Sequence, residues 1–512
     1  MELYEWQKDC LKAWEENSRR GIVHVVTGAG KTILALAAME KIRKEIPDVQ
    51  VRIVVHTIQL AGQWRRELRN FFPELDFTGR DIAMFHSGLE SPINAPFSIY
   101  VVNTARECIS DHIDKAMAAG HATFLVCDEC HHYTGECNRM IFSFRRMPHF
   151  NESLYAAIGL SATPYTRYYA DVLVPALGKE ICRYDLEAAV SDGLVSDFVI
   201  LNTGLRLSGE EAEEYGDLCD RISKQYGRVL YECPAIKSMP ADELMAFLYD
   251  AAKNEPDTEV GRLGLLIIRR KDLIRNASAR IPCAVDLISR LREDEKIILF
   301  CEYIEQADSR YARLKAHFPG RVCRYHSEMD KEARKYSIAA FKEGETSILV
   351  TCKALDEGFD VPACSIGIII SSTAMTRQRI QRLGRILRVR PEKPVSALYY
   401  LYVLGTLEDH VYLQTEEGTR SVSLQYREIR HAFSCEGYER AAVAVYRKNK
   451  TNLDPSMFQE FRSCVQEGIT RIDWLLPEEI LQQRISQADD RHARNYWLTM
   501  KLIASAYRRK AY

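Results

Sequence analysis

The sequence contains no apolar run long enough to cross a membrane, and it begins on an amphipathic pattern unlike a signal peptide. We therefore expect a cytoplasmic protein without a membrane-spanning segment. The net charge of its 512 residues is only −2, which argues against a surface coated in positive charge. Such a balance still permits nucleic-acid binding by basic groups gathered in a cleft. Low-complexity segments and short internal repeats are lacking as well.

The fifteen cysteines form no regular framework, and several lie inside apolar runs, as Cys301 and Cys352 do. We interpret them as reduced core residues of a cytosolic protein. One group could instead bind zinc: Cys127, Cys130, His131, His132 and Cys137. Its spacing is short and Cys127 is expected to point into a strand, which disfavours a structural zinc site.

The chain is too long for a single core, so we expect two to four domains. In its first part, apolar strand candidates alternate with helical patterns, which predicts a parallel α/β sheet with sites at the carboxyl ends of its strands. These strands are expected at 22–26, 51–55, 98–102, 123–127 and 155–160, after an amphipathic helix at 3–17.

A second α/β unit is predicted from a helix at 280–292 onward. Its strands are expected at 296–300, 322–325, 347–351, 365–370 and 396–404. The segment 207–260 is charged and helix-prone, which indicates a helical insertion. Beyond 411 the strand signal fades and a helical tail rich in basic and aromatic residues follows. The predicted domains are therefore 1–198, 199–410 with the insertion, and 411–512.

A glycine turn between the first strand and the next helix is typical of a phosphate-binding loop. The loop runs through Thr27, Gly28, Ala29, Gly30, Lys31 and Thr32. Its glycines let backbone N–H groups approach phosphate oxygens, Lys31 supplies charge for the β- and γ-phosphates, and Thr32 suits Mg²⁺. Val25 replaces the first glycine of the strict pattern, and an ordinary glycine turn carrying a lysine is the alternative.

Polar side chains follow the other strands at the same predicted edge. Asp128 could hold Mg²⁺ through water, and Glu129 could polarise a water that attacks the γ-phosphate. Gln7, on the first helix, is either a solvated glutamine or an amide placed to read the polar edges of adenine.

Two segments of the second unit are unusual for a core. Residues 351–362 form an acidic loop after a strand, and Arg382, Arg385 and Arg388 recur every three residues on roughly one helical face. Like charges this close indicate an anionic partner such as a triphosphate, or else a solvated basic face.

Taken together, these stretches resemble the motifs of superfamily 2 helicases and translocases, in the family order. The glutamine motif is Gln7, followed by TGAGKT (27–32), HTIQLAGQW (56–64), VVNTAR (101–106), DECHH (128–132), SAT (161–163), ILFCEYIEQA (298–307), TCKALDEGFDVP (351–362) and QRLGRILR (381–388). DECHH marks a DExH-type protein, and the overall pattern is closest to the XPB-like and restriction-translocase branch. Duplex DNA is then the favoured substrate.

The resemblance implies two tandem RecA-like parallel-sheet domains that bind ATP and Mg²⁺ between them, with a helical insertion and a helical C-terminal extension. By this resemblance, the residues that bind ATP and Mg²⁺ and carry out hydrolysis are Gln7, residues 27–32, Asp128, Glu129, Gln381, Arg385 and Arg388. Ser161 and Thr163 would couple hydrolysis to domain movement, and Gly358 and Asp360 would link ATP to the nucleic-acid track. The residues expected to contact the phosphodiester backbone are Thr57, Gln63, Thr104 and Thr351.

The implied activity is ATP-dependent movement on or remodelling of duplex or forked DNA, in repair, recombination or anti-phage defence. An RNA helicase is the nearest alternative. Another is a nucleic-acid-stimulated ATPase subunit that recruits protein partners through its tail and unwinds nothing alone. A degenerate structural homologue is disfavoured because the motif residues are intact.

Overall fold

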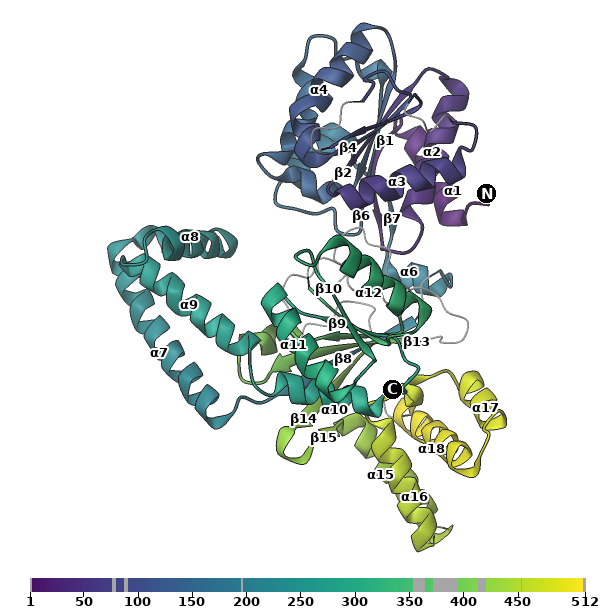
Figure 1. Cartoon of the computed structure of the whole chain (residues 1–512), viewed down its shortest axis with the longest axis vertical. Helices are drawn as coiled ribbons and strands as arrows, with labels where there is room; N and C mark the ends of the chain where they lie inside the picture. The colour runs from purple at the N-terminus through teal and green to yellow at the C-terminus, as the bar shows by residue number, and fades with distance from the viewer. Residues whose placement is uncertain are drawn as a thin grey trace. The chain divides into compact units, whose positions relative to one another are not determined.

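The computed structural model describes residues 2–75, 80–86, 91–194, 197–352, 364–371, 395–412, 420–452 and 454–509. The described residues divide between Asp197 and Phe198 into two compact units, each built around one β-sheet (Figure 1). Gly358, Asp360, Gln381, Arg385 and Arg388 lie outside the described residues.

The sheet of the first unit has seven strands, all parallel, in the order β3-β4-β2-β5-β6-β1-β7. Its inner strands β2, β5 and β6 are buried along their whole length, which explains their nearly continuous apolar sequences. The strands are β1 (Arg20–Val25), β2 (Gln50–Val55), β3 (Ile82–Phe85), β4 (Phe97–Val101), β5 (Thr123–Asp128), β6 (Tyr155–Ser161) and β7 (Glu180–Tyr184).

Helices cover both faces of this sheet (Figure 1). They are α1 (Glu5–Glu16), α2 (Lys31–Glu45), α3 (Ile58–Phe71), α4 (Val102–Ala118), α5 (Val174–Leu177) and α6 (Leu186–Ser191), with short helical turns η1 (Cys130–Thr134) and η2 (Asn138–Arg146). The strands predicted for this part are present. Two further strands, β3 and β7, lie at the two edges of the sheet and were not predicted.

The second unit has an eight-stranded sheet in the order β10-β11-β9-β12-β13-β8-β14-β15. The pairings from β10 to β13 are parallel, as is β8 with β14, whereas β15 runs antiparallel to β14. The strands are β8 (Asp197–Leu205), β9 (Ile297–Phe300), β10 (Val322–Tyr325), β11 (Ile348–Thr351), β12 (Ile366–Ile369), β13 (Val395–Val403), β14 (Arg420–Arg427) and β15 (Ala432–Ser434). Helices α10 (Arg280–Arg290), α11 (Ile304–His317) and α12 (Lys331–Glu343) accompany it.

The expectation that strands end near residue 411 was wrong, because β14 and β15 follow. In β14, buried side chains alternate with more exposed ones: Val422, Leu424 and Tyr426 face the core. This is the period-two pattern of a strand with one buried face. This alternation is present in the sequence, but a single short strand among helical patterns is difficult to recognise.

Between β8 and α10 the chain forms a separate helical insertion that projects from the sheet (Figure 1). Its helices are α7 (Gly209–Glu232), α8 (Ala241–Asn254) and α9 (Glu259–Arg275). They enclose a small core of their own, made of Val229, Ile236, Leu248, Leu263 and Ile267. The insertion therefore extends about one helix beyond the predicted limit near residue 260.

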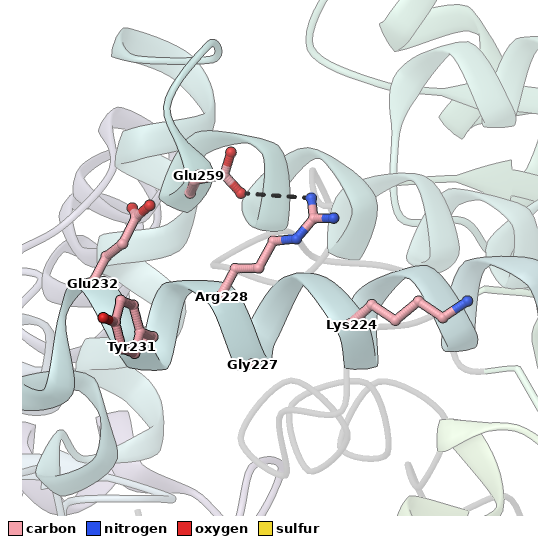
Figure 2. A pocket seen from close by; sticks show the side chains of 6 residues that line it. All are labelled: Lys224, Gly227, Arg228, Tyr231, Glu232 and Glu259. Atoms are coloured by element: carbon pink, nitrogen blue, oxygen red, sulfur yellow. Dashed lines mark ion pairs between the residues drawn. The ribbon is translucent and has the colours of Figure 1, made fainter.

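An open groove in this insertion is lined by residues of α7 and by Glu259 at the start of α9, and Figure 2 shows these side chains. Lys224, Arg228 and Tyr231 follow one another at helical spacing, and the Tyr231 side chain is 89% exposed. Arg228 is balanced by Glu259, with 4.0 Å between their charged groups. None of the site residues predicted from the sequence lines this groove, so it is a feature of the insertion alone.

The C-terminal helices are part of the second unit's core. Tyr399 of β13 and the tail residues Tyr438, Trp474 and Met500 belong to one buried cluster. The Tyr399 hydroxyl donates to the Thr470 carbonyl at 2.5 Å, which adds a buried polar contact between sheet and tail. The tail helices are α14 (Leu407–Tyr412), α15 (Glu436–Asn449), α16 (Pro455–Gly468), α17 (Glu478–Ser486) and α18 (Arg491–Arg508).

All fifteen cysteines are free thiols. In the part of the chain that the structure describes, no group of three His, Cys, Asp or Glu residues is arranged to hold a metal ion. None of the described helices combines the length and apolar character that a membrane crossing requires.

Because Trp474 is 1% exposed in the shared core, we expect Trp474→Ala to lower the free energy of unfolding of the second unit by about 3–5 kcal/mol. Urea unfolding followed by circular dichroism measures this loss. Leu502→Ala is the control, since Leu502 is 46% exposed on α18 and should change stability by less than about 0.5 kcal/mol. An unchanged unfolding midpoint for Trp474→Ala would show that the tail folds independently of the sheet.

Candidate functional site

The predicted phosphate loop connects β1 to α2 at the carboxyl edge of the first sheet. Gly28 and Gly30 have φ values of 93° and 98°, which residues with a Cβ rarely adopt. Gly30 is the N-cap of α2, which begins at Lys31. The loop therefore places the free N–H groups of a fifteen-residue helix beside a lysine, an arrangement suited to phosphate.

Lys31 forms an ion pair with Glu129, with 2.6 Å between Nζ and Oε1. Both side chains are nearly buried, with exposed fractions of 11% and 15%. Burial alone would raise the pKa of Glu129, but the Lys31 ammonium and His131 outweigh it and lower this pKa to about 2. Glu129 is thus a carboxylate at neutral pH. It is also one of four non-glycine residues described with positive φ, at 47°, which is a strained conformation found at functional sites.

Asp128 ends β5 and is held by two donors. Trp64 Nε1 donates to Oδ2 at 2.9 Å, and the Glu129 backbone N–H donates to Oδ1 at 3.0 Å. Burial and the neighbouring Glu129 carboxylate raise the pKa of Asp128, so these donors help to keep it ionised.

Trp64 also belongs to the site, although its position in the motif at 56–64 did not predict a contact with Asp128. It lies on α3, where its ring is 1% exposed and packs like an ordinary core residue. Periodicity identifies Trp64 as buried but does not reveal that its N–H reaches Asp128. The only available signal was its place at the end of the HTIQLAGQW motif.

Ser161, at the end of β6, and nearby Thr163 connect to the acid pair Asp128–Glu129 through His131. The His131 Nδ1 atom lies 2.8 Å from Ser161 Oγ, which also accepts a hydrogen bond from the Thr163 N–H at 3.0 Å. His131 Nδ1 is 3.5 Å from Glu129 Oε2. The end of β6 is therefore in contact with the acid pair through one imidazole.

Gln7 is buried and contacts the phosphate loop directly. Its Nε2 donates to the Gly30 carbonyl at 3.1 Å, and its Oε1 accepts from the Tyr4 N–H at 3.0 Å. A Cβ on residue 30 would stand 2.8 Å from Gln7 Nε2, so the contact depends on glycine. Of the two interpretations of Gln7, the solvated one is wrong, since its residue is 1% exposed.

The four predicted nucleic-acid contacts differ in accessibility. Thr57 caps α3, where its hydroxyl accepts from the Leu60 N–H at 3.2 Å, and Gln63 and Thr104 are also partly exposed. Thr351 ends β11 in the second unit and is 0% exposed. Its hydroxyl donates to the Tyr325 carbonyl at 2.9 Å, so in this arrangement a phosphodiester does not reach it.

The donor set fits a nucleotide with Mg²⁺. The Thr32 hydroxyl and the Asp128 carboxylate are oxygen ligands of the type that Mg²⁺ prefers. Glycine N–H groups and Lys31 match the charge of a triphosphate. The predicted second half of the site, at Gln381, Arg385 and Arg388, lies outside the described residues.

Two family models match the chain. The model described as type III restriction enzyme, res subunit, matches residues 1–166, and the helicase conserved C-terminal domain matches residues 279–390. Together they cover the phosphate loop, the acid pair and the arginine-rich segment.

Curated relatives carry helicase names. The chain is 26% identical over 410 residues to the DNA 3'-5' translocase XPB2 of Sulfurisphaera tokodaii, which covers 80% of this chain and 83% of that one. It is 24% identical to a putative DNA 3'-5' helicase Rad25 of Halobacterium salinarum over 80% of this chain. The matched region spans 55% of that second relative.

Among solved structures, the helicase domain of Hef from Pyrococcus furiosus is similar with a TM-score of 0.51. The alignment covers 80% of this chain and 98% of that one, at 17% identity. At this identity the likeness speaks for the fold alone. It confirms the predicted fold class of two RecA-like α/β units with a helical C-terminal segment.

We expect Trp64→Phe to raise the Mg²⁺ concentration needed for half-maximal ATP hydrolysis about tenfold, the usual cost of removing a side chain that orients a metal ligand. A Mg²⁺ titration at saturating ATP measures this change. Trp14→Phe is the matched control, because Trp14 is also 1% exposed and donates from Nε1 to the Ala157 carbonyl, away from Asp128. An equal shift in both variants would refute the positioning role of Trp64.

Proposed function

Since this chain is an ATP-hydrolysing superfamily 2 helicase, related to XPB-like proteins and to the res subunits of type III restriction enzymes, we propose that ATP turnover drives its movement along duplex or forked DNA. The observation that carries the proposal is the buried contact between Lys31 of the phosphate loop and Glu129 of the acid pair. This ion pair joins the phosphate loop to the acid pair at the carboxyl edge of one parallel sheet.

In this proposal the loop from Thr27 to Thr32 binds the phosphates of ATP, and Gln7 reads the adenine. Thr32 and Asp128 would hold Mg²⁺, which would neutralise phosphate charge. Lys31 is shared between Glu129 and the incoming γ-phosphate. When the phosphate draws the ammonium away, Glu129 becomes free to orient a water and to accept its proton.

The second unit completes the site in the same proposal. Arg385 and Arg388 stabilise charge on the transferred phosphoryl group, and Gln381 positions the nucleotide or the water. An arginine placed in this way contributes on the order of 10³–10⁵ in rate. Gly358 and Asp360 link this half of the site to the nucleic-acid track, so turnover depends on closure of the two units.

Hydrolysis is proposed to reach the nucleic acid through the contact of His131 with Ser161, next to Thr163. Thr57, Gln63 and Thr104 then hold the phosphodiester backbone without reading sequence. Alternate closure and opening of the two units would move these contacts stepwise along the strand.

DNA is favoured as the track because the relatives XPB2 and Rad25 are named as DNA 3'-5' enzymes. We place the activity in DNA repair, recombination or anti-phage defence, and in the cytoplasm, where free thiols are expected. Protein partners would bind the exposed side of the C-terminal helices, since their inner side is occupied by the sheet.

We expect Glu129→Gln to reduce ATP turnover by about 10²–10⁴-fold, the usual contribution of a general base, while ATP binding persists. Lys31→Ala should lose both turnover and binding, because it removes a phosphate ligand. Steady-state ATPase and binding of a fluorescent nucleotide separate the two effects, with circular dichroism to verify folding. Normal turnover by folded Glu129→Gln would exclude the role assigned to Glu129.

We expect duplex or forked DNA to stimulate ATPase activity more strongly than RNA of matched sequence. The measurement is steady-state ATPase without nucleic acid, and with single-stranded DNA, blunt duplex, fork and RNA, using Lys31→Ala as the background. Stimulation by RNA alone would identify an RNA helicase. Basal activity that no nucleic acid stimulates would instead favour an ATPase subunit that needs a partner protein.

A further inference from the structure

Helix α1 and edge strand β7 pack against each other through matched side chains. The Trp6 ring stacks on Tyr184, with centroids 4.7 Å apart and planes 12° from parallel. From Trp6 to Cys10 the helix rises about 6 Å. From Tyr184 back to Cys182 the strand covers about 6.6 Å on the same face. The packing that aligns the two rings therefore also places Cys10 opposite Cys182.

The two side chains interact. A hydrogen bond between the thiols raises the pKa of Cys10 and lowers that of Cys182. Cys10 is 1% exposed, whereas Cys182 is partly exposed at the edge of the sheet. The accessible thiol is thus the one whose thiolate, the reactive form, is stabilised, and the buried one is its neighbour.

We propose that Cys10 and Cys182 are a modification site at which hydrogen peroxide forms a reversible disulfide between α1 and β7. The Cys182 thiolate attacks a peroxide oxygen, the O–O bond breaks, and the sulfenic acid forms with release of hydroxide. The Cys10 sulfur then displaces hydroxide from the Cys182 sulfur to form the S–S bond. Two thiols and one peroxide yield one disulfide and two waters, and a dithiol reductant reverses the change.

The cross-link acts on the phosphate loop from two sides. Gln7 lies one helical turn before Cys10 and donates to the Gly30 carbonyl. Cys182 pairs in register with Val23 of β1, the strand that leads into the loop. The disulfide therefore fixes the helix that carries Gln7 to the strand beside β1, and keeps the Gln7 amide on Gly30.

The functional consequence rests on the proposed reading of adenine by Gln7. In this proposal, ATP binding shifts the Gln7 amide from the Gly30 carbonyl toward the base, and the disulfide restricts the accompanying shift of α1. Oxidation should therefore raise the KM for ATP roughly fivefold, at the low end of coupling between sites. The kcat should stay unchanged, because Lys31, Asp128 and Glu129 lie on other elements.

The test uses the full chain with exposed Cys137 replaced by serine, reduced and then titrated with hydrogen peroxide. Non-reducing peptide mass spectrometry should find a Cys10–Cys182 cross-link that dithiothreitol removes. Cys10→Ala should instead accumulate a sulfenic acid on Cys182, trapped by dimedone, and Cys182→Ala should form neither product. Oxidation of Cys182 to sulfinic acid without any cross-link in the parent chain would overturn the proposal, as would no reaction at Cys182.

ATPase kinetics then test the coupling. The cross-linked parent should show the raised KM, and Cys10→Ala given the same peroxide should keep the KM of the reduced protein. A cross-linked protein with unchanged KM and nucleotide affinity would overturn the coupling to Gln7. A failure of the proposed DNA motor would be distinguishable from a failure of the disulfide proposal. In that case nucleic acid would not stimulate the ATPase activity of the reduced protein, but the disulfide would still form with peroxide.

Discussion

The contact between Lys31 and Glu129 is the interaction on which the rest of the first unit depends. Two opposite charges lie almost out of water, and removal of either would deprive the other of its ion-pair partner. The pair forms because β1 and β5 are both neighbours of β6 and end at the same edge. Gly159 of β6 lets the neighbouring elements pack closely, since a Cβ there would lie 2.8 Å from Leu177 Cδ1 and 3.3 Å from Cys130 Sγ and Ile22 Cγ1. The order of the strands and the close packing at Gly159 thus fix the positions of the two charges in the site.

The structure shows how far local sequence carries a prediction. Most buried strands were located because continuous apolar runs are hard to miss, and the family motifs placed Lys31, Asp128 and Glu129. Strand β8 was not predicted, although residues 198–205 are buried, because it directly follows a turn-rich stretch. The pairing of Lys31 with Glu129, 98 positions apart, follows only from sheet order. The same holds for the contact of Trp64 with Asp128. Edge strand β7 escaped because most of its residues are only partly buried, which weakens the apolar signal.

The insertion and the tail illustrate two ways to attach helices to a RecA-like unit. The insertion has its own small core, so it can keep its internal packing while its base adjusts. The tail has none of its own, because Tyr438, Trp474 and Met500 pack in the cluster that also holds Tyr399 of the sheet. A helical pattern alone does not distinguish the two, since both sequences are amphipathic and charged. The difference is that the apolar faces of the insertion pack against each other, whereas those of the tail also pack against the sheet.

The shared core of the second unit also has a consequence during synthesis. The first sheet has all its strands once β7 has emerged from the ribosome, but β8 must wait for β14, and Tyr399 for helix α18. At translation rates of 5–20 residues per second, the roughly 240 residues from the end of β7 to the end of β14 take about 12–50 s. For that interval the phosphate loop and acid pair can already be folded, while one edge of β8 waits for β14. The first unit, with the proposed nucleotide loop, can therefore fold before the second sheet is complete.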